Sequence, residues 1–347
     1  MRPEFITDPA RWQQVVDSLP DFYGKAYYNA CYHKAYQLND EGRPAALYFK
    51  QDQTEIFYPF LLRPIPAILG GDGFFDMQSA YGYGGPAVFG GTTETLGDFS
   101  RLHAAWAEKA GIVAEFVRFN PFLAQDLLAP LFDPELNRKT ISIELNADFA
   151  VILRQASGPR QRNYRKAVRS GLSYFSMPDC DDLVKIYRQA MQRIGAEDYY
   201  YFSDRYFSAI SEMPTDTRFF AGIRDASGKL IAGGIFLQDA SAAHYHLGAS
   251  VTDARALQAD AFMLFEAARS AAANGRKILH LGGGLSLAEE DGLYRFKAGF
   301  SENRHNFYIA RKIHRPEKYD EFSKKWQAIT GRQPKILLHY HEDITEA

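Results

Sequence analysis

The stretch Ile278-Leu279-His280-Leu281-Gly282-Gly283-Gly284 decides the fold that we expect for this chain. A short, mainly apolar run closed by three glycines predicts a buried strand that ends abruptly. Glycine lets the backbone approach a ligand closely and adopt a positive φ, so the triplet predicts a floor beneath a bound group. A plain turn is the alternative interpretation. Gly283 and Gly284 are therefore candidate substrate-binding residues.

A lysine follows on an aromatic segment, Phe296-Lys297-Ala298-Gly299-Phe300. The compact charge of an ammonium group suits a phosphate or a developing oxyanion. We therefore expect Lys297 to be catalytic and Phe296 to lie in the binding site. An ordinary lysine whose stem lies along the surface is the alternative.

Outside this stretch, the two halves of the chain are predicted to contain the same secondary-structure elements in the same order. Each half is predicted to contain a helix, a hairpin, a further extended segment, a second helix and a strand. In the first half these are residues 8–37, 45–63, 79–86, 93–110 and 112–119, and in the second 183–191, 218–237, 242–248, 256–273 and 277–281. The pattern predicts two α/β domains, 1–145 and 146–347, the second with a C-terminal extension. Coincidence between two common α/β patterns is the alternative.

Composition excludes several classes of protein. The 347 residues suit two domains, and 46% hydrophobic residues suit a sizeable core. A net charge of −2 does not indicate a nucleic-acid or membrane surface, and no apolar run approaches the roughly 18 residues of a membrane span. Two cysteines, Cys31 and Cys180, and the absence of a signal peptide predict a cytoplasmic protein.

The most basic segment is residues 158–169, which contains five cations and no acid. On a helix, such a cluster can bind the phosphates of a nucleotide or of RNA. A solvated helix face is the alternative interpretation.

Six segments, in this order, resemble the Fem-type aminoacyltransferases of the GNAT-like acyltransferase superfamily. The resemblance extends from about Trp12 to Phe307. The segments are Tyr81-Gly82-Tyr83-Gly84-Gly85-Pro86, Glu115-Phe116-Val117-Arg118-Phe119, Arg162-Asn163-Tyr164-Arg165-Lys166-Ala167, His244-Tyr245-His246-Leu247, Leu281-Gly282-Gly283-Gly284 and Phe296-Lys297-Ala298-Gly299-Phe300.

The resemblance implies two tandem GNAT-like domains, each a mixed sheet flanked by helices. It implies transfer of an amino acid from aminoacyl-tRNA to the amine of a peptidoglycan precursor or a small molecule. Lys297 is then expected to stabilise a donor phosphate or the oxyanion. Tyr81 and Tyr83 are expected to line the acceptor cleft. The phosphates of the acceptor are expected to be contacted by the basic helix, through Arg162, Asn163, Arg165 and Lys166.

One departure from the superfamily bears on the acyl donor. An acyl-CoA loop needs small residues before its helix so that backbone N–H groups can hold pyrophosphate. Here Gln258 and Asp260 stand at those positions in residues 255–260. This favours aminoacyl-tRNA over acyl-CoA as co-substrate, although no coiled-coil arm typical of tRNA users is visible. An acyl-CoA N-acetyltransferase and a non-catalytic nucleotide- or RNA-binding member remain alternatives.

The predicted chemistry is direct attack by the acceptor amine, because no metal-ligand spacing and no nucleophile–base pair stands out. No bound cofactor is expected. His244 and His246, two residues apart on one strand, share a face, and His246 is a candidate base. Hydrogen-bonded strand histidines are the alternative. Tyr200 is expected to border the cleft. The sequence gives no signal for oligomeric state.

Overall fold

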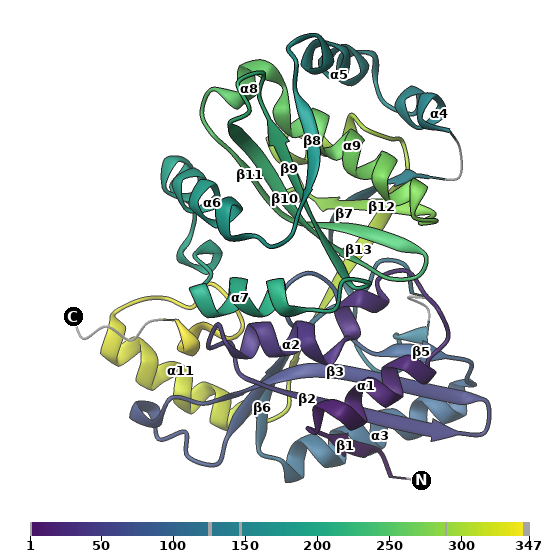
Figure 1. Ribbon diagram of the computed structural model, residues 1–347. Coiled ribbons are helices and arrows are strands. Elements are labelled where there is room, and N and C mark those ends of the chain that lie inside the picture. The colour runs from purple at the N-terminus through teal and green to yellow at the C-terminus, as the bar shows by residue number, and fades with distance from the viewer. Residues whose placement is uncertain (1, 124–126, 146–147, 289, 343–347) are drawn as a thin grey trace. The chain divides into compact units, whose positions relative to one another are not determined.

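The computed structural model describes residues 2–123, 127–145, 148–288 and 290–342 (Figure 1). They pack into two compact units. Unit 1 comprises Met1–Pro20, Tyr28–Leu136 and Phe307–Ala347, and unit 2 comprises Asp21–Tyr27 and Asn137–Asn306. Each unit is a mixed sheet flanked by helices, as predicted. The bounds differ from the predicted ranges, because the segment expected as an extension of the second domain packs in unit 1.

Unit 1 has its strands in the order β1-β2-β3-β4-β6-β13, with β5 paired to β3. All these pairs are antiparallel except β4 with β6, which is parallel. Its elements among the described residues are β1 (Glu4–Ile6), α1 (Pro9–Ser18), α2 (Ala30–Gln37), β2 (Arg43–Gln51), β3 (Thr54–Pro64), η2 (Ala67–Leu69), β4 (Phe75–Gln78), β5 (Ala87–Phe89), α3 (Thr93–Lys109), β6 (Ile112–Arg118), β13 (Arg304–Ile313), α11 (Pro316–Thr330) and η5 (His339–His341).

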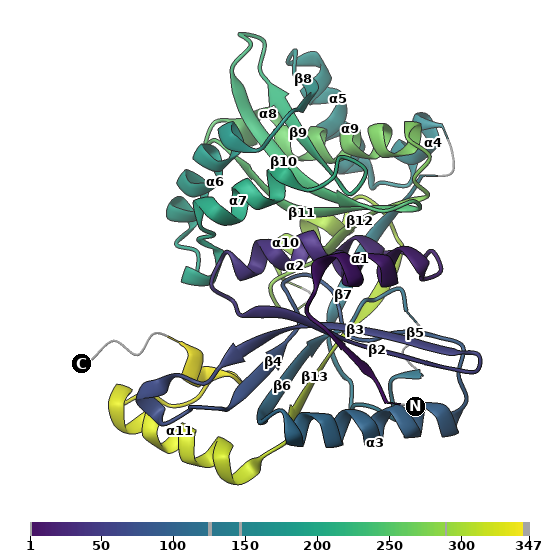
Figure 2. The same ribbon diagram turned by 60° about the horizontal axis from the view of Figure 1, so that its bottom comes forward.

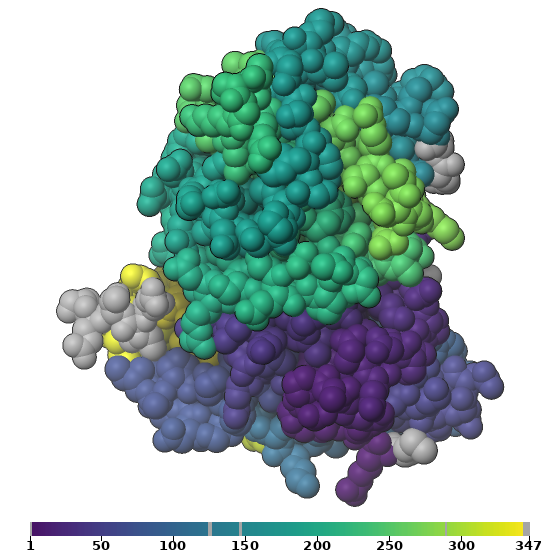
Figure 3. Space-filling view, in the orientation of Figure 1, coloured from purple at the N-terminus to yellow at the C-terminus, as the bar shows by residue number. Residues whose placement is uncertain are grey.

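Helices cover both faces of the unit 1 sheet. Successive residues of a strand point to opposite faces. Phe57 of β3 accordingly packs edge-on against Trp12 of α1, with ring centroids 5.6 Å apart, and its neighbour Tyr58 packs against His103 of α3 at 5.8 Å. Figure 2 shows α3 on one side of β2 and β3 and α1 with α2 on the other. In Figure 3, α1 forms part of the visible surface of this unit.

The helix α3 illustrates how the sequence sets these contacts. Thr92 and Thr95 form a capping box at its N-terminus. Leu96, Phe99, His103 and Ala107 then recur at helical spacing and are buried. This spacing points the imidazole of His103 into the core.

The end of the described chain is anchored inside unit 1. The buried carboxylate of Asp76 accepts hydrogen bonds from Tyr340 Oη at 3.1 Å and from the backbone N–H of Ala114 at 2.9 Å. His341 Nε2 lies 2.7 Å from its other oxygen. The segment after β13 is therefore an integral part of this core.

Unit 2 has its strands in the order β7-β12-β11-β10-β9-β8. Only β11 and β12 pair in parallel. Its described elements are η1 (Lys25–Tyr28), whose last residue is counted in unit 1, β7 (Glu135–Glu144), α4 (Phe149–Arg154), α5 (Gly158–Arg169), β8 (Ser173–Met177), α6 (Asp181–Ile194), η4 (Asp198–Tyr200), α7 (Asp204–Glu212), β9 (Arg218–Arg224), β10 (Leu230–Gln238), β11 (Ala242–Ser250), α8 (Ala254–Leu257), α9 (Ala259–Ala273), β12 (Ile278–Gly283) and α10 (Gly292–Ala298).

Two adjacent glycines of β10 show that this sheet is also covered on both faces. A Cβ on Gly233 would meet Leu183 of α6 at 3.1 Å, and one on Gly234 would meet Met263 of α9 at 3.2 Å. Neighbouring residues face opposite sides of a sheet, so α6 and α9 lie on opposite faces. Figures 1 and 2 show α9 with α4 and α5 on one side of these strands and α6 with α7 on the other.

The prediction of one continuous helix over residues 256–273 is wrong in one respect. Gln258 has a left-handed backbone, with φ of 63°, and separates α8 from α9. Non-glycine residues rarely adopt this conformation, so the residue types did not indicate the break. Among the described residues, no helix is both long and apolar enough to cross a membrane.

Candidate active site

Lys297 is buried on α10, with 8% of its surface exposed. Its Nζ donates a hydrogen bond of 2.8 Å to the carbonyl oxygen of Gly283, the last residue of β12. The same ammonium lies 5.7 Å from the centroid of the Tyr245 ring on β11. Lys297 and the glycine segment, singled out separately in the sequence, therefore form one site.

The pKa of Lys297 is lowered from 10.5 to about 7, chiefly because burial removes water from the charged form. The carboxylate of Asp291 acts in the opposite direction, and the guanidinium of Arg138 adds to the lowering. Near neutral pH the neutral form of this side chain is therefore accessible, which is unusual for a lysine.

The glycine segment is held by two cations. Gly282 has a φ of 72°, which turns the chain at the end of β12. The carbonyl of Gly283 accepts from Lys297, and that of Gly284 accepts from Arg138 at 2.5 Å. A Cβ on Gly284 would lie 2.6 Å from Asp291, so a side chain there would displace the loop. The packing of the loop therefore requires a glycine at position 284, and substrate binding by Gly283 and Gly284 stays a prediction.

Asp291 organises the loop between the glycines and α10. Its oxygens accept hydrogen bonds from the backbone N–H groups of Leu285 at 2.6 Å, Ser286 at 2.9 Å and Tyr294 at 2.8 Å. Burial acts to raise the pKa of Asp291, but these N–H groups outweigh it and the pKa is lowered. The carboxylate is thus a helix cap that also favours the charged form of Lys297.

The basic helix α5 is joined to α10 by Arg160. Its guanidinium lies 4.4 Å from the ring centroid of Phe296, and its Nε donates to the carbonyl of Phe296 at 3.2 Å. Arg162 and Lys166 are exposed, and Asn163 is half-buried. Arg160, which sequence reasoning did not single out, therefore brings this charged face close to the helix that carries Lys297.

His244 and His246 have different partners. His246 Nε2 lies 2.6 Å from Tyr206 Oη, and burial lowers the pKa of His246 to about 3. The pairing of β10 with β11 is irregular here, since Ile235 faces Leu247 and the next residue faces Tyr245. His246 is therefore the extra residue of a β-bulge.

His244 belongs to a row of polar side chains across the unit 2 sheet. Its Nδ1 lies 3.4 Å from His280 Nδ1, and its Nε2 lies 3.5 Å from Asp239. The ring of His280 also packs against His305, which contacts Ser142 Oγ at 2.7 Å. Burial, His244, His305 and Lys297 all lower the pKa of His280. Neither His280 nor His305 was predicted, because strand pairing, not spacing, brings them together.

The remaining predicted residues lie in loops and turns. In unit 2, Tyr200 is half-buried at the end of η4, and its carbonyl accepts from Tyr187 Oη at 2.9 Å. In unit 1, the carbonyl of Tyr81 accepts from Tyr32 Oη at 2.5 Å, and the ring of Tyr83 packs edge-on against Phe307 at 5.2 Å.

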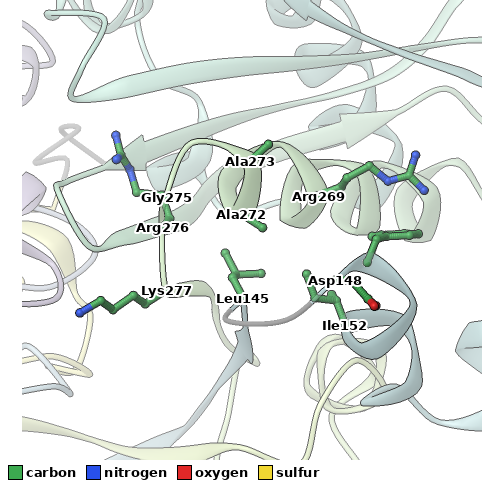
Figure 4. A pocket seen from close by; sticks show the side chains of 10 residues that line it. Leu145, Asp148, Ile152, Arg269, Ala272, Ala273, Gly275, Arg276 and Lys277 are labelled. Atoms are coloured by element: carbon green, nitrogen blue, oxygen red, sulfur yellow. The ribbon is translucent and has the colours of Figure 1, made fainter.

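A hollow of about 450 Å³ lies in unit 2 between α4, the end of α9 and the start of β12 (Figure 4). Leu145, Ile152 and Ala272 form part of its apolar wall, and Lys277 lies at its edge. Lys277, the residue before β12, precedes Gly283 by six positions, which corresponds to about 20 Å along a strand. This hollow is therefore separate from the site around Lys297.

Residues 159–298 match the family model described as "Acetyltransferase (GNAT) domain". The match runs from α5 to α10 and includes the site around Lys297. Among solved structures, the chain is similar to FemX, with a TM-score of 0.63 and 13% identity over 90% of this chain and 96% of that chain. The chain has the GNAT-like fold of FemX. The predicted resemblance to this Fem-type, GNAT-like fold is thereby confirmed.

Two further solved structures are similar to this chain. One is the C-terminal domain (DUF2156) of a putative lysylphosphatidylglycerol synthetase from Agrobacterium fabrum, with a TM-score of 0.55 and 14% identity over 92% of this chain and 95% of that chain. The other is L-PGS from Bacillus licheniformis, with a TM-score of 0.52 and 12% identity over 94% of this chain and 98% of that chain. At these identities the likeness shows the fold alone. Comparison with curated proteins gave no match.

Proposed function

We propose that this chain is an acyltransferase that forms an amide bond, with aminoacyl-tRNA as donor and an amine, such as that of a peptidoglycan precursor, as acceptor. The observation that carries the proposal is the burial of Lys297 against the carbonyl of Gly283, with a pKa of about 7. The match to an acetyltransferase (GNAT) domain over residues 159–298 supports acyl transfer as the reaction class.

The reaction needs a cation where negative charge develops. The acceptor nitrogen attacks the ester carbonyl carbon, and the carbonyl oxygen becomes an oxyanion. As the intermediate collapses, the C–O bond to the donor breaks, the amine loses one proton and the leaving oxygen gains one. A protonated Lys297 in a poorly hydrated site stabilises the oxyanion more strongly than it would in water.

Lys297 suits this role better than His246 suits that of a base. A general base works best with a pKa near the working pH, and the pKa of His246 is about 3. The hydrogen bond with Tyr206 Oη holds this imidazole inside unit 2. We therefore propose that the rate depends on the protonation of Lys297. His246 is assigned a positioning role.

The exposed face of α5 supports a phosphate-bearing substrate. Arg162, Arg165, Lys166 and Arg169 are all exposed there, and Arg160 ties the helix to α10. Guanidinium groups bind phosphate oxygens with two parallel hydrogen bonds. The similar structure from Agrobacterium fabrum is named a putative lysylphosphatidylglycerol synthetase. A phosphate-bearing substrate is consistent with this cationic face.

A transfer assay tests the proposal. Labelled aminoacyl-tRNA is incubated with a UDP-linked muropeptide and the wild-type chain, Lys297→Met, or Lys185→Met, whose lysine is exposed on α6. We expect product with the wild type and with Lys185→Met, and a loss of roughly 10²–10³-fold with Lys297→Met. Equal rates for all three would contradict the role of Lys297. Tight tRNA binding without product would favour a non-catalytic RNA-binding protein.

Acetyl transfer from acetyl-CoA is the second candidate, because the matching family model describes acetyltransferases. Against it stands Asp260, whose Oδ2 accepts from Ser250 Oγ at 3.1 Å in the first turn of α9. A carboxyl group there opposes a pyrophosphate at this helix end. Thermal stabilisation by acetyl-CoA but not by aminoacyl-tRNA would favour this second function.

A further inference from the structure

Three buried side chains meet in unit 1, on elements that carry no part of the site around Lys297. They are His103 on α3, Glu115 on β6 and His314 just after β13. One nitrogen or oxygen of each lies within 4.8 Å of those of the other two. The side chains are 1%, 0% and 6% exposed, respectively.

The fold brings these three residues together from separate parts of unit 1. His103 lies on the buried stripe of α3. Glu115 lies on β6, opposite Lys312 of the antiparallel strand β13. His314 follows β13 and is fixed by a hydrogen bond of 2.8 Å from its backbone N–H to the carbonyl of Val113. His103 is therefore held by a helix, and the backbone of His314 is held by a hydrogen bond to β6.

The distances within the cluster are short. His314 Nε2 lies 2.7 Å from Glu115 Oε2, and His103 Nε2 lies 3.5 Å from Glu115 Oε1. Tyr58 Oη donates to Oε1 at 2.5 Å. The surrounding rings are apolar, with Phe99 stacked on His103 at 6.1 Å and Phe132 at the same distance. A carboxylate enclosed in this way requires compensating positive charge.

A second observation separates this cluster from an ordinary buried ion pair. His103 Nε2 points toward Glu115, yet among the described residues it has no hydrogen-bond partner and almost no contact with solvent. A buried polar atom without a partner costs free energy and calls for an explanation. An ion between the nitrogen and the carboxylate would satisfy it.

We propose that His103, Glu115 and His314 bind a divalent transition-metal ion of the zinc class. Two imidazoles and a carboxylate are a donor set that such ions prefer. Ligand atoms about 2.1 Å from a tetrahedral ion lie about 3.4 Å apart. The 3.5 Å between His103 Nε2 and Glu115 Oε1 already fits this value. His314 Nε2 lies 2.7 Å from the other oxygen, Oε2, so its hydrogen bond with Oε2 must be given up when the ion binds.

Binding requires a lone pair on His314 Nε2. In the metal-bound form the neutral ring therefore carries its hydrogen on Nδ1. The hydrogen bond from Tyr58 remains on the carboxylate and orients it from outside the metal shell. The charge of Lys312, which acts electrostatically on His103, opposes the ion and limits its affinity. The bound ion would link α3, β6 and the end of β13.

The test uses the full-length chain without an affinity tag. It is freed of metal with a chelator and titrated with Zn²⁺, and with Co²⁺ as a spectroscopic probe. We expect one ion per chain, the visible absorption of tetrahedral Co²⁺ and a Zn²⁺-induced rise in melting temperature of about 5 °C that EDTA reverses. No stoichiometric binding, or an octahedral Co²⁺ spectrum typical of surface sites, would overturn the proposal.

Variants locate the ion. His103→Gln should lose stoichiometric Co²⁺ binding, because it removes the nitrogen that has no other partner. His33→Gln is the matched control, since His33 is a buried histidine of the same unit whose Nδ1 contacts the carbonyl of Asn29 at 3.2 Å. Equal Co²⁺ binding in both variants would place the ion elsewhere and overturn the assignment. If His103→Gln fails to fold, the wild-type Co²⁺ spectrum and stoichiometry decide the question.

Discussion

The ammonium of Lys297 lies 2.8 Å from the carbonyl oxygen of Gly283, so the cation of α10 rests on the last peptide of β12. This contact is made inside unit 2, away from bulk water. It joins the two halves of the stretch that the sequence singled out, the glycine segment and the aromatic-flanked lysine. Four predictions follow from this cation and from the helices around it.

Lys297→Met should slow transfer by roughly 10²–10³-fold and raise stability. The folded pKa of Lys297 is below its unfolded value, so the unfolded chain binds more protons between about pH 7 and 10.5 and stability rises with pH there. Below pH 7 the cost of burying the charge is present in full. Removing the charge should stabilise the fold by about 2 kcal/mol at roughly pH 6, after allowing for the lost hydrogen bond. Urea unfolding at roughly pH 6 and pH 10 measures the difference.

Measuring the stability difference between Lys297→Met and the wild type at both pH values provides an internal control. The advantage of Lys297→Met should shrink as pH rises, because the folded wild-type chain no longer carries the buried charge above about pH 7. Lys185→Met changes an exposed lysine and should alter stability by less than about 0.5 kcal/mol at either pH. A destabilised Lys297→Met variant would show that the ammonium is structural.

The pH dependence of transfer should report Lys297. If the charged form stabilises the oxyanion, kcat falls as pH rises through about 7, the pKa of this group. Deprotonation of the acceptor amine acts in the opposite direction and gives the profile an acidic limb. Rates measured with saturating acceptor over the neutral range separate the two limbs. A kcat that is constant from neutral to alkaline pH would rule out a role for the charged form.

Asp291→Asn should move that alkaline limb to lower pH. The carboxylate of Asp291 favours the charged form of Lys297, so its neutral replacement lowers the pKa of Lys297 further. Asparagine also caps helices well, and the cap on Tyr294 should survive. A displaced pH profile with unchanged helix content supports the electrostatic link. A large loss of stability without a shift of the pH profile would show that Asp291 acts only as a helix cap.

Two neighbouring arginines of α5 should respond differently. Arg160→Met removes the contact with Phe296 and should lower both stability and kcat, because α5 and α10 lose the side-chain contact that Arg160 makes between them. Arg162 is exposed, and Arg162→Met should raise KM for a phosphate-bearing substrate while leaving the melting temperature unchanged. Steady-state kinetics with thermal unfolding of both variants provides the test. Identical effects would remove the distinction between a packing and a binding arginine.

The sequence indicated the fold through the spacing of its apolar residues and the positions of its glycines. The hairpins at 45–63 and 218–237 appear as β2–β3 and β9–β10, and the strand at 277–281 appears as β12. The break at Gln258 was missed because a left-handed glutamine has no signature in residue type. The strand β8 and the helix α7 were also not predicted.

The site was indicated only where its residues are close in sequence. Gly283, Phe296 and Lys297 fall within one short stretch, whereas His280 and His305 come together through the pairing of separate strands. Glu115 and His314 are 199 positions apart, so no spacing rule could connect them. Their meeting depends on the register of β6 with β13, which local sequence does not determine.

Unit 1 is assembled from three segments of the chain, the last beginning at Phe307, whereas unit 2 is almost entirely the continuous run Asn137–Asn306. A ribosome therefore releases all of unit 2 before it delivers β13 and α11. Unit 2 can fold as soon as it emerges, while the earlier-made strands of unit 1 wait with an unpaired edge on β6. Chaperone dependence during synthesis should accordingly concentrate in the N-terminal half, although that half is translated first.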